Sequence, residues 1–186
     1  QKGFFESRYW RVQRYNASGL AQGSAIQITT LNLINGQAGV ATDANNNFVV
    51  VWDDGGINAQ RYSNSGKKVG SQITVNGNDP GAVIQWQGSV GRDADGDFVV
   101  PWVIRRLDSQ NLPYFEHYVQ VFNNNGTKRG GAILTRTSTM ETSESIAVQA
   151  GGDFVLSWTE QSAQTATDVF ARRFDLNGVA KETAQR

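Results

Sequence analysis

The fold of this chain is indicated by one stretch, DADGDFVVPW at residues 93–102, which recurs twice in variant form. The earlier copy is DANNNFVVVW at residues 43–52, and the later copy is QAGGDFVLSW at residues 149–158. The tryptophans that close the three copies are 50 and 56 residues apart. Such a period is typical of proteins built from repeated supersecondary units.

In each copy a polar turn leads into an apolar strand. The Asp, Asn and Gly residues tolerate left-handed backbone and bond to their own chain. The Phe-Val-Val-x-Trp run has the β-branched and aromatic composition of a strand. Phe48, Val50 and Trp52 share one face of that strand, and Val49 and Val51 share the other. Because both faces are apolar, we expect the strand to be covered on both sides.

A second motif, a strand that runs into a turn, occurs four times. Its turns end at Gly19, Gly66, Gly126 and Gly178. Because the first motif occurs only three times, the sequence predicts three full repeats preceded by an N-terminal half-repeat in a single repeat domain. The predicted units are residues 1–36 (half-repeat), 37–84, 85–138 and 139–186.

Each full repeat is predicted to contain four strands. In the first repeat they cover about Gly39–Thr42, Phe48–Trp52, Asn58–Tyr62 and Val69–Val75. The short connections favour an antiparallel meander, and the absence of a 3.6-residue period argues against long helices. The predicted fold class is therefore all-β, with repeated four-stranded antiparallel sheets that are typical of β-propeller blades.

The repeat pattern is Val-x-x-Asp-x-x-Gly-Asp-Phe-Val-Val-x-Trp, followed by x-Ala-Gln-Arg-Tyr/Phe-x-x-x-Gly. It resembles the repeats of large bacterial extracellular proteins, which often also carry calcium-binding and adhesion modules. The resemblance covers nearly the whole chain and implies a secreted or cell-surface location. The chain departs from the pattern at Gln149, where Asp is typical, and at Pro101. Since proline has no N–H for a sheet ladder, Pro101 is expected at a bulge or an edge.

Composition limits the function further. Lys+Arg and Asp+Glu both number 17, so the net charge is zero, which argues against a nucleic-acid partner. No apolar run reaches the roughly 18 residues of a membrane span. The chain has no Cys, which fits an exported bacterial repeat protein and rules out thiol chemistry. Gln1 in place of an initiator Met suggests a processed or excised start.

Ligand-binding residues are expected at the end of the sheets where the loops vary. In a meander, the connections from second to third strand and from one repeat to the next lie at the same end. The former are predicted to be short at residues 53–57, long at 103–117 and intermediate at 159–168, and variable loops often carry binding residues. The candidates there are Trp86, Arg105, Arg106, Tyr114 and His117. Their aromatic rings could stack on sugars, or could instead cover gaps between sheets.

Arg105 and Arg106, with Asp108, could form a local ion pair on a solvated loop or a carboxylate or sulfate site. The candidate metal ligands are Asp93, Asp95 and Asp97, whose spacing matches the opening of a calcium loop. That loop requires a glycine where Phe98 stands, so the alternative is a turn that satisfies its own backbone. We therefore expect no obligatory cofactor, with calcium as the one candidate.

Catalysis has little support in the sequence. His117 is the only histidine, and no Gly-x-Ser-x-Gly motif occurs. The predicted function is a non-enzymatic extracellular structural or adhesive module that self-assembles through its incomplete terminal repeat. The alternatives are a carbohydrate-binding, lectin-like propeller and a fragment of a hydrolase propeller. The expected partners are a second copy of the chain or a larger parent chain, with a glycan as a further candidate.

Overall fold

The computed structural model describes residues 9–29, 37–53, 56–77, 84–87, 89–140, 142, 144–161 and 167–186, and of 84–87 the backbone only. The chain divides into two units, residues 1–36 and 37–186, which are described separately below. Every regular element among the described residues is a β-strand, and every strand pair is antiparallel. The prediction of an all-β chain of repeated antiparallel sheets is confirmed.

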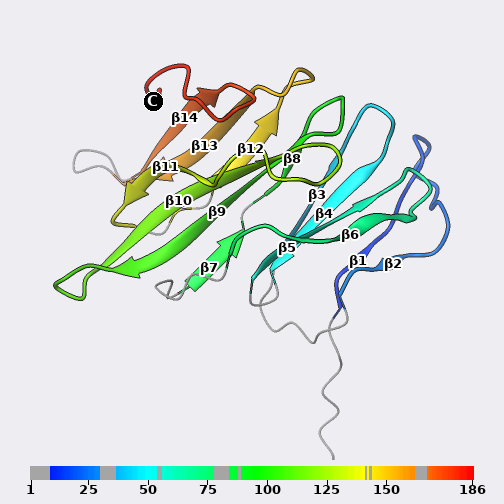
Figure 1. Ribbon diagram of the computed structural model, residues 1–186, viewed down its shortest axis with the longest axis horizontal. Coiled ribbons are helices and arrows are strands. Elements are labelled where there is room, and N and C mark those ends of the chain that lie inside the picture. The colour runs from blue at the N-terminus through cyan, green and yellow to red at the C-terminus, as the bar shows by residue number, and fades with distance from the viewer. Residues whose placement is uncertain are drawn as a thin grey trace, which may run out of the picture. The chain divides into compact units, whose positions relative to one another are not determined.

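The first sheet of residues 37–186 is a four-stranded meander in chain order. It contains β3 (Ala38–Thr42), β4 (Phe48–Asp53), β5 (Ile57–Tyr62) and β6 (Lys68–Thr74) (Figure 1). Each strand end lies within one residue of its predicted position. All five residues of the Phe-Val-Val-Val-Trp run are 3% exposed or less, so the predicted covering of β4 on both faces is also confirmed.

The second sheet has an interrupted first strand. It contains β7 (Ile84–Gln87), β8 (Gly91–Arg92), β9 (Phe98–Leu107), β10 (Pro113–Phe122) and β11 (Ile133–Ser138). Both β7 and β8 pair with β9, and Pro101 lies on β9 between the segments that they pair with. A residue without an N–H thus stands opposite the interruption, which fits the expectation for Pro101.

The predicted long loop at residues 103–117 is wrong. β9 continues to Leu107 and β10 begins at Pro113, so the two strands form one long hairpin. Its five-residue turn is held by Asp108, whose Oδ1 accepts the N–H groups of Gln110 (2.8 Å) and Leu112 (2.9 Å). The Asp-x-x-Asn turn, with Asn111 at φ 60°, lets the strands run on past the point where the other repeats turn.

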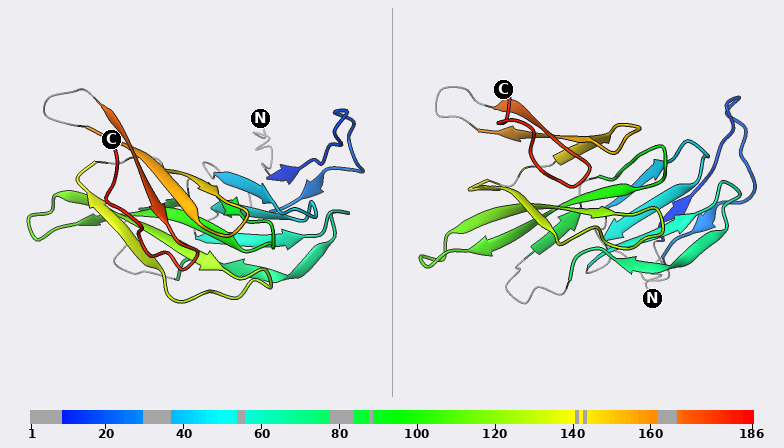
Figure 2. Two further views of the ribbon diagram at one scale, coloured as in Figure 1. Left: turned by 90° about the horizontal axis from the view of Figure 1, so that it is seen from above. Right: turned by 45° about the horizontal axis from the view of Figure 1, so that its top comes forward.

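The third sheet contains β12 (Glu144–Val148), β13 (Phe154–Glu160) and β14 (Asp168–Phe174). After β14 the chain returns along it through isolated bridges between Phe174 and Ala180 and between Ala171 and Gln185. This returning segment takes the place of a fourth strand. The views in Figure 2 show the three sheets of residues 37–186 following one another in chain order.

Two buried clusters join the three sheets by the same rule. One face of each sheet packs against the opposite face of the next sheet. In the first junction Val49, Val51 and Ala59 meet Phe98, Val100, Trp102 and Phe122. In the second junction Val99, Val119 and Val121 meet Phe154, Leu156, Trp158 and Phe174. We call Val49, Val51 and Ala59, with their equivalents in the other sheets, the aliphatic row of a sheet. We call Phe98, Val100, Trp102 and Phe122, with their equivalents, the aromatic row.

Each full sheet contains an equivalent aromatic stack between its second and third strands, and the second and third sheets each contain a further one, Trp102 on Tyr118 and Trp158 on Phe170. The ring centroids are 4.9 Å apart for Phe48 and Tyr62, 4.6 Å for Phe98 and Phe122, and 5.0 Å for Phe154 and Phe174. The third-strand member of each equivalent stack is at most 3% exposed. This stack ties the two strands together and contributes its ring to the aromatic row.

Residues 9–29 form a hairpin in which β1 (Arg11–Val12) pairs with β2 (Ile26–Gln27). Gln13 Nε2 donates to the Gly23 carbonyl, ten residues ahead, at 3.2 Å. The same side-chain bond over ten residues occurs in each full sheet: Gln60 to Gly70 (3.3 Å), Gln120 to Gly130 (3.2 Å) and Arg172 to Glu182 (2.8 Å). The N-terminal hairpin therefore has the local structure of the third and fourth strands of a repeat.

Candidate functional site

A cleft of about 500 Å³ opens at the loop end of the second and third sheets. Its described lining residues come from β10, β11, the connection from β11 to β12, and the end of β13. They are Tyr114, Thr137, Ser138, Thr139, Met140, Thr142, Glu160 and Gln161. The volume lies within the range of small-molecule sites. The lining combines hydroxyl groups, one carboxylate, one amide and a tyrosine ring, and is thus rich in hydrogen-bonding groups.

A buried charged cluster of His117, Arg136 and Glu144 adjoins the cleft. The side chains of His117 and Glu144 are 0% and 2% exposed, and the His117 Nδ1 and Glu144 Oε1 atoms are 3.1 Å apart. Arg136 Nε lies 3.0 Å from the same Glu144 oxygen, and Arg136 Nη2 donates to Thr142 Oγ1 at 2.6 Å. Burial lowers the pKa of Arg136, although the neighbouring Glu144 carboxylate acts in the opposite direction.

The His117 ring connects this cluster to the cleft. Its Nε2 is 3.0 Å from Ser138 Oγ, and that hydroxyl donates to the Met140 carbonyl at 2.7 Å. Because the Ser138 proton is used in this way, Nε2 must carry a proton and donate. The other nitrogen, Nδ1, is 3.1 Å from both Arg136 Nη2 and Glu144 Oε1. With the proton on Nε2, Nδ1 is free to accept from Arg136 Nη2.

The residues proposed from sequence for ligand binding all lie on the second sheet, where Tyr114 and Arg106 are cross-strand partners, but they do not all line the cleft. Tyr114 lines the cleft, whereas His117 is fully buried next to it. Arg105 and Arg106 lie on β9, where Arg106 pairs with Glu116, whose Oε2 also accepts the Tyr118 hydroxyl at 3.0 Å. These two arginines are absent from the described lining of the cleft. Trp86 lies within the strand β7 and not in a variable loop, and its side chain is outside the described part.

Sequence reasoning missed most of the cleft. Thr137, Ser138 and Thr142 come from the stretch TSTMETSE at residues 137–144, and Glu160 ends β13. The density of hydroxyl side chains in that stretch was the available signal. It became informative only once the packing of the second sheet against the third was known.

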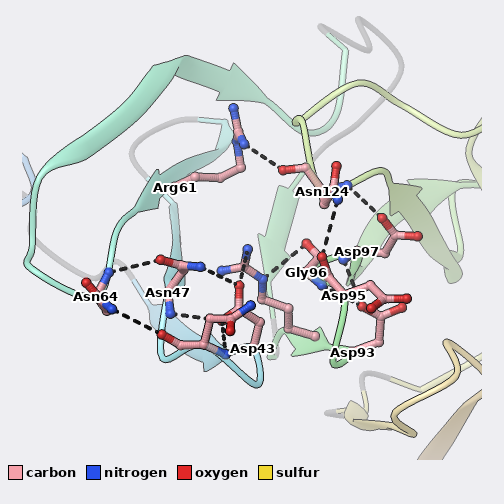
Figure 3. A network of polar contacts seen from close by, with 11 residues as sticks. Asp43, Asn47, Arg61, Asn64, Asp93, Asp95, Gly96, Asp97 and Asn124 are labelled. Atoms are coloured by element: carbon pink, nitrogen blue, oxygen red, sulfur yellow. Dashed lines mark hydrogen bonds and ion pairs between the residues drawn. The ribbon is translucent and has the colours of Figure 1, made fainter.

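At the opposite end, the Asp-rich turns form a polar network across the first two sheets (Figure 3). Asp43 Oδ1 accepts the N–H groups of Asn45 and Asn47, both at 2.9 Å. Asp43 Oδ2 is 3.1 Å from Arg92 Nη2, and both side chains are at most 5% exposed. Burial lowers the pKa of Arg92, against the effect of Asp43. This ion pair joins the turn of the first sheet to β8.

In the candidate calcium turn, two of the three carboxylates bind the chain's own groups. Asp93 Oδ1 accepts the N–H groups of Gly96 (2.8 Å) and Asp97 (2.9 Å), and burial raises the pKa of Asp93. Asp97 accepts the N–H of Asn124 at 2.6 Å and pairs with Arg129. Among the described residues, no group of three or more acidic, His or Cys side chains is placed to hold a metal. Calcium at Asp93, Asp95 and Asp97 stays a prediction.

No protein-family model matches the chain, and no curated protein sequence matches it with significance. The resemblance to repeats of bacterial extracellular proteins therefore stays an expectation. Within the described ranges, no helix is long and apolar enough to cross a membrane.

Proposed function

We propose that this chain is a non-enzymatic structural or adhesive repeat module of an extracellular surface, which self-assembles through its incomplete N-terminal hairpin. The observation that carries the proposal is the exposure of Tyr15. Tyr15 stands at the repeat position of Tyr62, Phe122 and Phe174, which are all buried. Tyr15 itself is 64% exposed.

The environment of Tyr15 differs from that of its counterparts in the full sheets. In each full sheet the equivalent ring stacks on a phenylalanine of the second strand, namely Phe48, Phe98 or Phe154. The described hairpin of residues 9–29 contains no equivalent of the second strand, so Tyr15 has no such partner among the described residues. Among the described residues 9–29, β1 pairs only with β2, so its other edge has no described partner strand.

An open edge beside an exposed aromatic ring is suited to taking up another polypeptide. Proteins rarely leave such edges bare, because the unpaired backbone groups promote association. Strand addition uses main-chain hydrogen bonds for affinity and side-chain pockets for specificity. The alternating turns and strands of this chain supply many segments of suitable composition. A second copy of the chain, or a larger parent chain, is therefore the expected partner.

Replacing Tyr15 with aspartate is expected to weaken self-association at least tenfold, because a charge would stand where the other repeats bury an aromatic ring. Leu20→Asp is the matched control, since Leu20 is equally 64% exposed and lies in the turn of the same hairpin. Sedimentation velocity over a concentration series measures both variants. Equal association constants for the Y15D and L20D variants would contradict the proposal.

A second candidate function is carbohydrate binding, which the cleft lining favours. Hydroxyl groups, Glu160 and Gln161 can exchange hydrogen bonds with sugar hydroxyls, and Tyr114 can offer a ring face. Thr139→Arg would place a long charged side chain at the cleft and is expected to abolish glycan binding. Ser65→Arg is the control, because Ser65 is exposed in the β5–β6 turn of the first sheet, far from the cleft. A glycan array that gives no signal with the wild-type chain would exclude this candidate.

A further inference from the structure

The outer face of the third sheet repeats the aliphatic row without a following sheet. Val155, Ser157 and Ala171 stand at the repeat positions of Val49, Val51 and Ala59. The latter three are 0% exposed in the first junction. In the third sheet the equivalent residues are only half-buried, and Val169 on the same face is 65% exposed. The residues of this face therefore stand at the positions that form a junction in the other sheets, yet they are exposed to solvent here.

The backbone links between sheets point to the same conclusion. The Ala44 N–H donates to the Ala94 carbonyl, and the Ala94 N–H donates to the Ala150 carbonyl, both at 3.3 Å. Each bond runs from a turn to the equivalent turn of the following sheet. The next donor in this series is the Ala150 N–H, which has no hydrogen-bond acceptor among the described residues. The Ala150 N–H could therefore donate to the equivalent turn of a further sheet.

Arginine contacts at the turns also recur. Arg61 Nη1 donates to the Asn124 carbonyl at 2.6 Å, and Arg129 Nη1 donates to the Leu176 carbonyl at 3.3 Å. Asn124 and Leu176 occupy the same position in their turns, one sheet further along the chain. Arg173 of the third sheet stands at the position of Arg61. Its side chain is 57% exposed and pairs with Glu182 on its own sheet.

The exposed row that fits this face belongs to the N-terminal hairpin. At each junction the aliphatic row receives an aromatic row that includes Phe122 or Phe174. In the first sheet the corresponding residue, Tyr62, is also buried, with an exposed fraction of 1%. Tyr15 is the member of this series that is exposed. Tyr15 of one chain has the repeat position of an aromatic row, and the outer face of the third sheet of another chain has that of an aliphatic row. These are the two rows that pack together at the junctions within the chain.

We propose that the outer face of the third sheet, formed by Ala147, Val155, Ser157, Val169 and Ala171, receives the N-terminal hairpin of a second copy of this chain. This inference rests on the proposed function and adds the receiving surface. The contact joins two different surfaces, so it is heterologous and produces a head-to-tail series of chains. Such a series closes into a ring when its rotation allows, and otherwise extends as a filament.

The test uses site-specific labels, because the chain contains no Cys. A nitroxide is attached to Val169→Cys on the proposed face or to Val179→Cys, a turn residue of the same sheet. Val169 and Val179 are 65% and 63% exposed, so the two sites are matched. As the chain concentration rises, the label at position 169 should lose mobility and the label at position 179 should keep it.

Two second-site changes identify both partners of the contact. Ala171→Arg in the 169-labelled chain should weaken the immobilisation at least tenfold by placing a charge at the centre of the face. Tyr15→Asp should do the same from the hairpin side, whereas Leu20→Asp should have no effect. If the chain assembles while the label at position 169 stays mobile, this inference is wrong and the proposed function stands. If the chain does not assemble at any concentration, both are wrong.

Discussion

Replacing Trp102 with alanine is expected to lower the free energy of unfolding by about 3–5 kcal/mol, the usual cost of deleting a large buried ring. Trp102 is 3% exposed and belongs to the aromatic row of the second sheet. Its ring also stacks on Tyr118 with centroids 5.6 Å apart. The substitution would therefore leave a cavity at the junction of the first two sheets and remove an aromatic stack within the second sheet.

Urea unfolding followed by circular dichroism measures this effect. Val40→Ala is the control, because Val40 lies in β3 and is 56% exposed, so its loss should change stability little. A decrease of less than about 1 kcal/mol for the Trp102 variant would show that the junction tolerates the loss of its largest ring. That result would contradict the packing rule on which the sheet stack depends.

Replacing Glu144 with alanine is expected to cost about 3–5 kcal/mol, because it removes the anion that faces the largely buried Arg136 guanidinium. Glu144 is 4% exposed, and one of its carboxylate oxygens faces both Arg136 and the His117 ring. Removal of that oxygen leaves Arg136 with only the more distant and more exposed Glu160 carboxylate, 3.7 Å from Nη1, to offset its desolvation. The cluster joins the second and third sheets, so the substitution should weaken the junction between them.

A second variant separates charge from packing in this cluster. The double substitution Glu144→Leu with Arg136→Met removes both charges and should recover most of the stability, since apolar replacement of a whole buried pair is often neutral. Glu182→Ala, which breaks the exposed pair with Arg173, should have a far smaller effect than Glu144→Ala. Thermal unfolding measures both variants. Equal decreases in stability for Glu144→Ala and Glu182→Ala would show that the buried cluster contributes no more to stability than the exposed pair.

Sequence patterns predicted the strands well where composition and turn chemistry agreed. The Phe-Val-Val-x-Trp run and its Asp-rich turn located β4 and its neighbours within one residue, because the two-residue period and the turn residues each limit the register. The same reasoning assigned the N-terminal hairpin to a half-repeat, and the hairpin shares with the full sheets a side-chain bond that spans ten residues. It also anticipated the irregular sheet position of Pro101, which stands opposite the gap between β7 and β8.

The site could not be predicted because it depends on contacts between sheets. His117 was assigned to a loop, but the hairpin of β9 and β10 continues past it and buries its ring against Glu144 of the third sheet. No local pattern shows which residues 27 positions apart will meet. The cleft likewise combines Tyr114 with Glu160, which come from different repeats. Only the packing rule between successive sheets brings these side chains together.

In the proposed assembly, the exposed Tyr15 hairpin of one chain contacts the open face of the third sheet of another. Light scattering of the intact chain over a range of concentrations tests this claim most directly. The predicted result is an average mass that rises with concentration above the 20.3 kDa of one chain and falls back for the Tyr15→Asp variant. A mass of one chain at every concentration would contradict it.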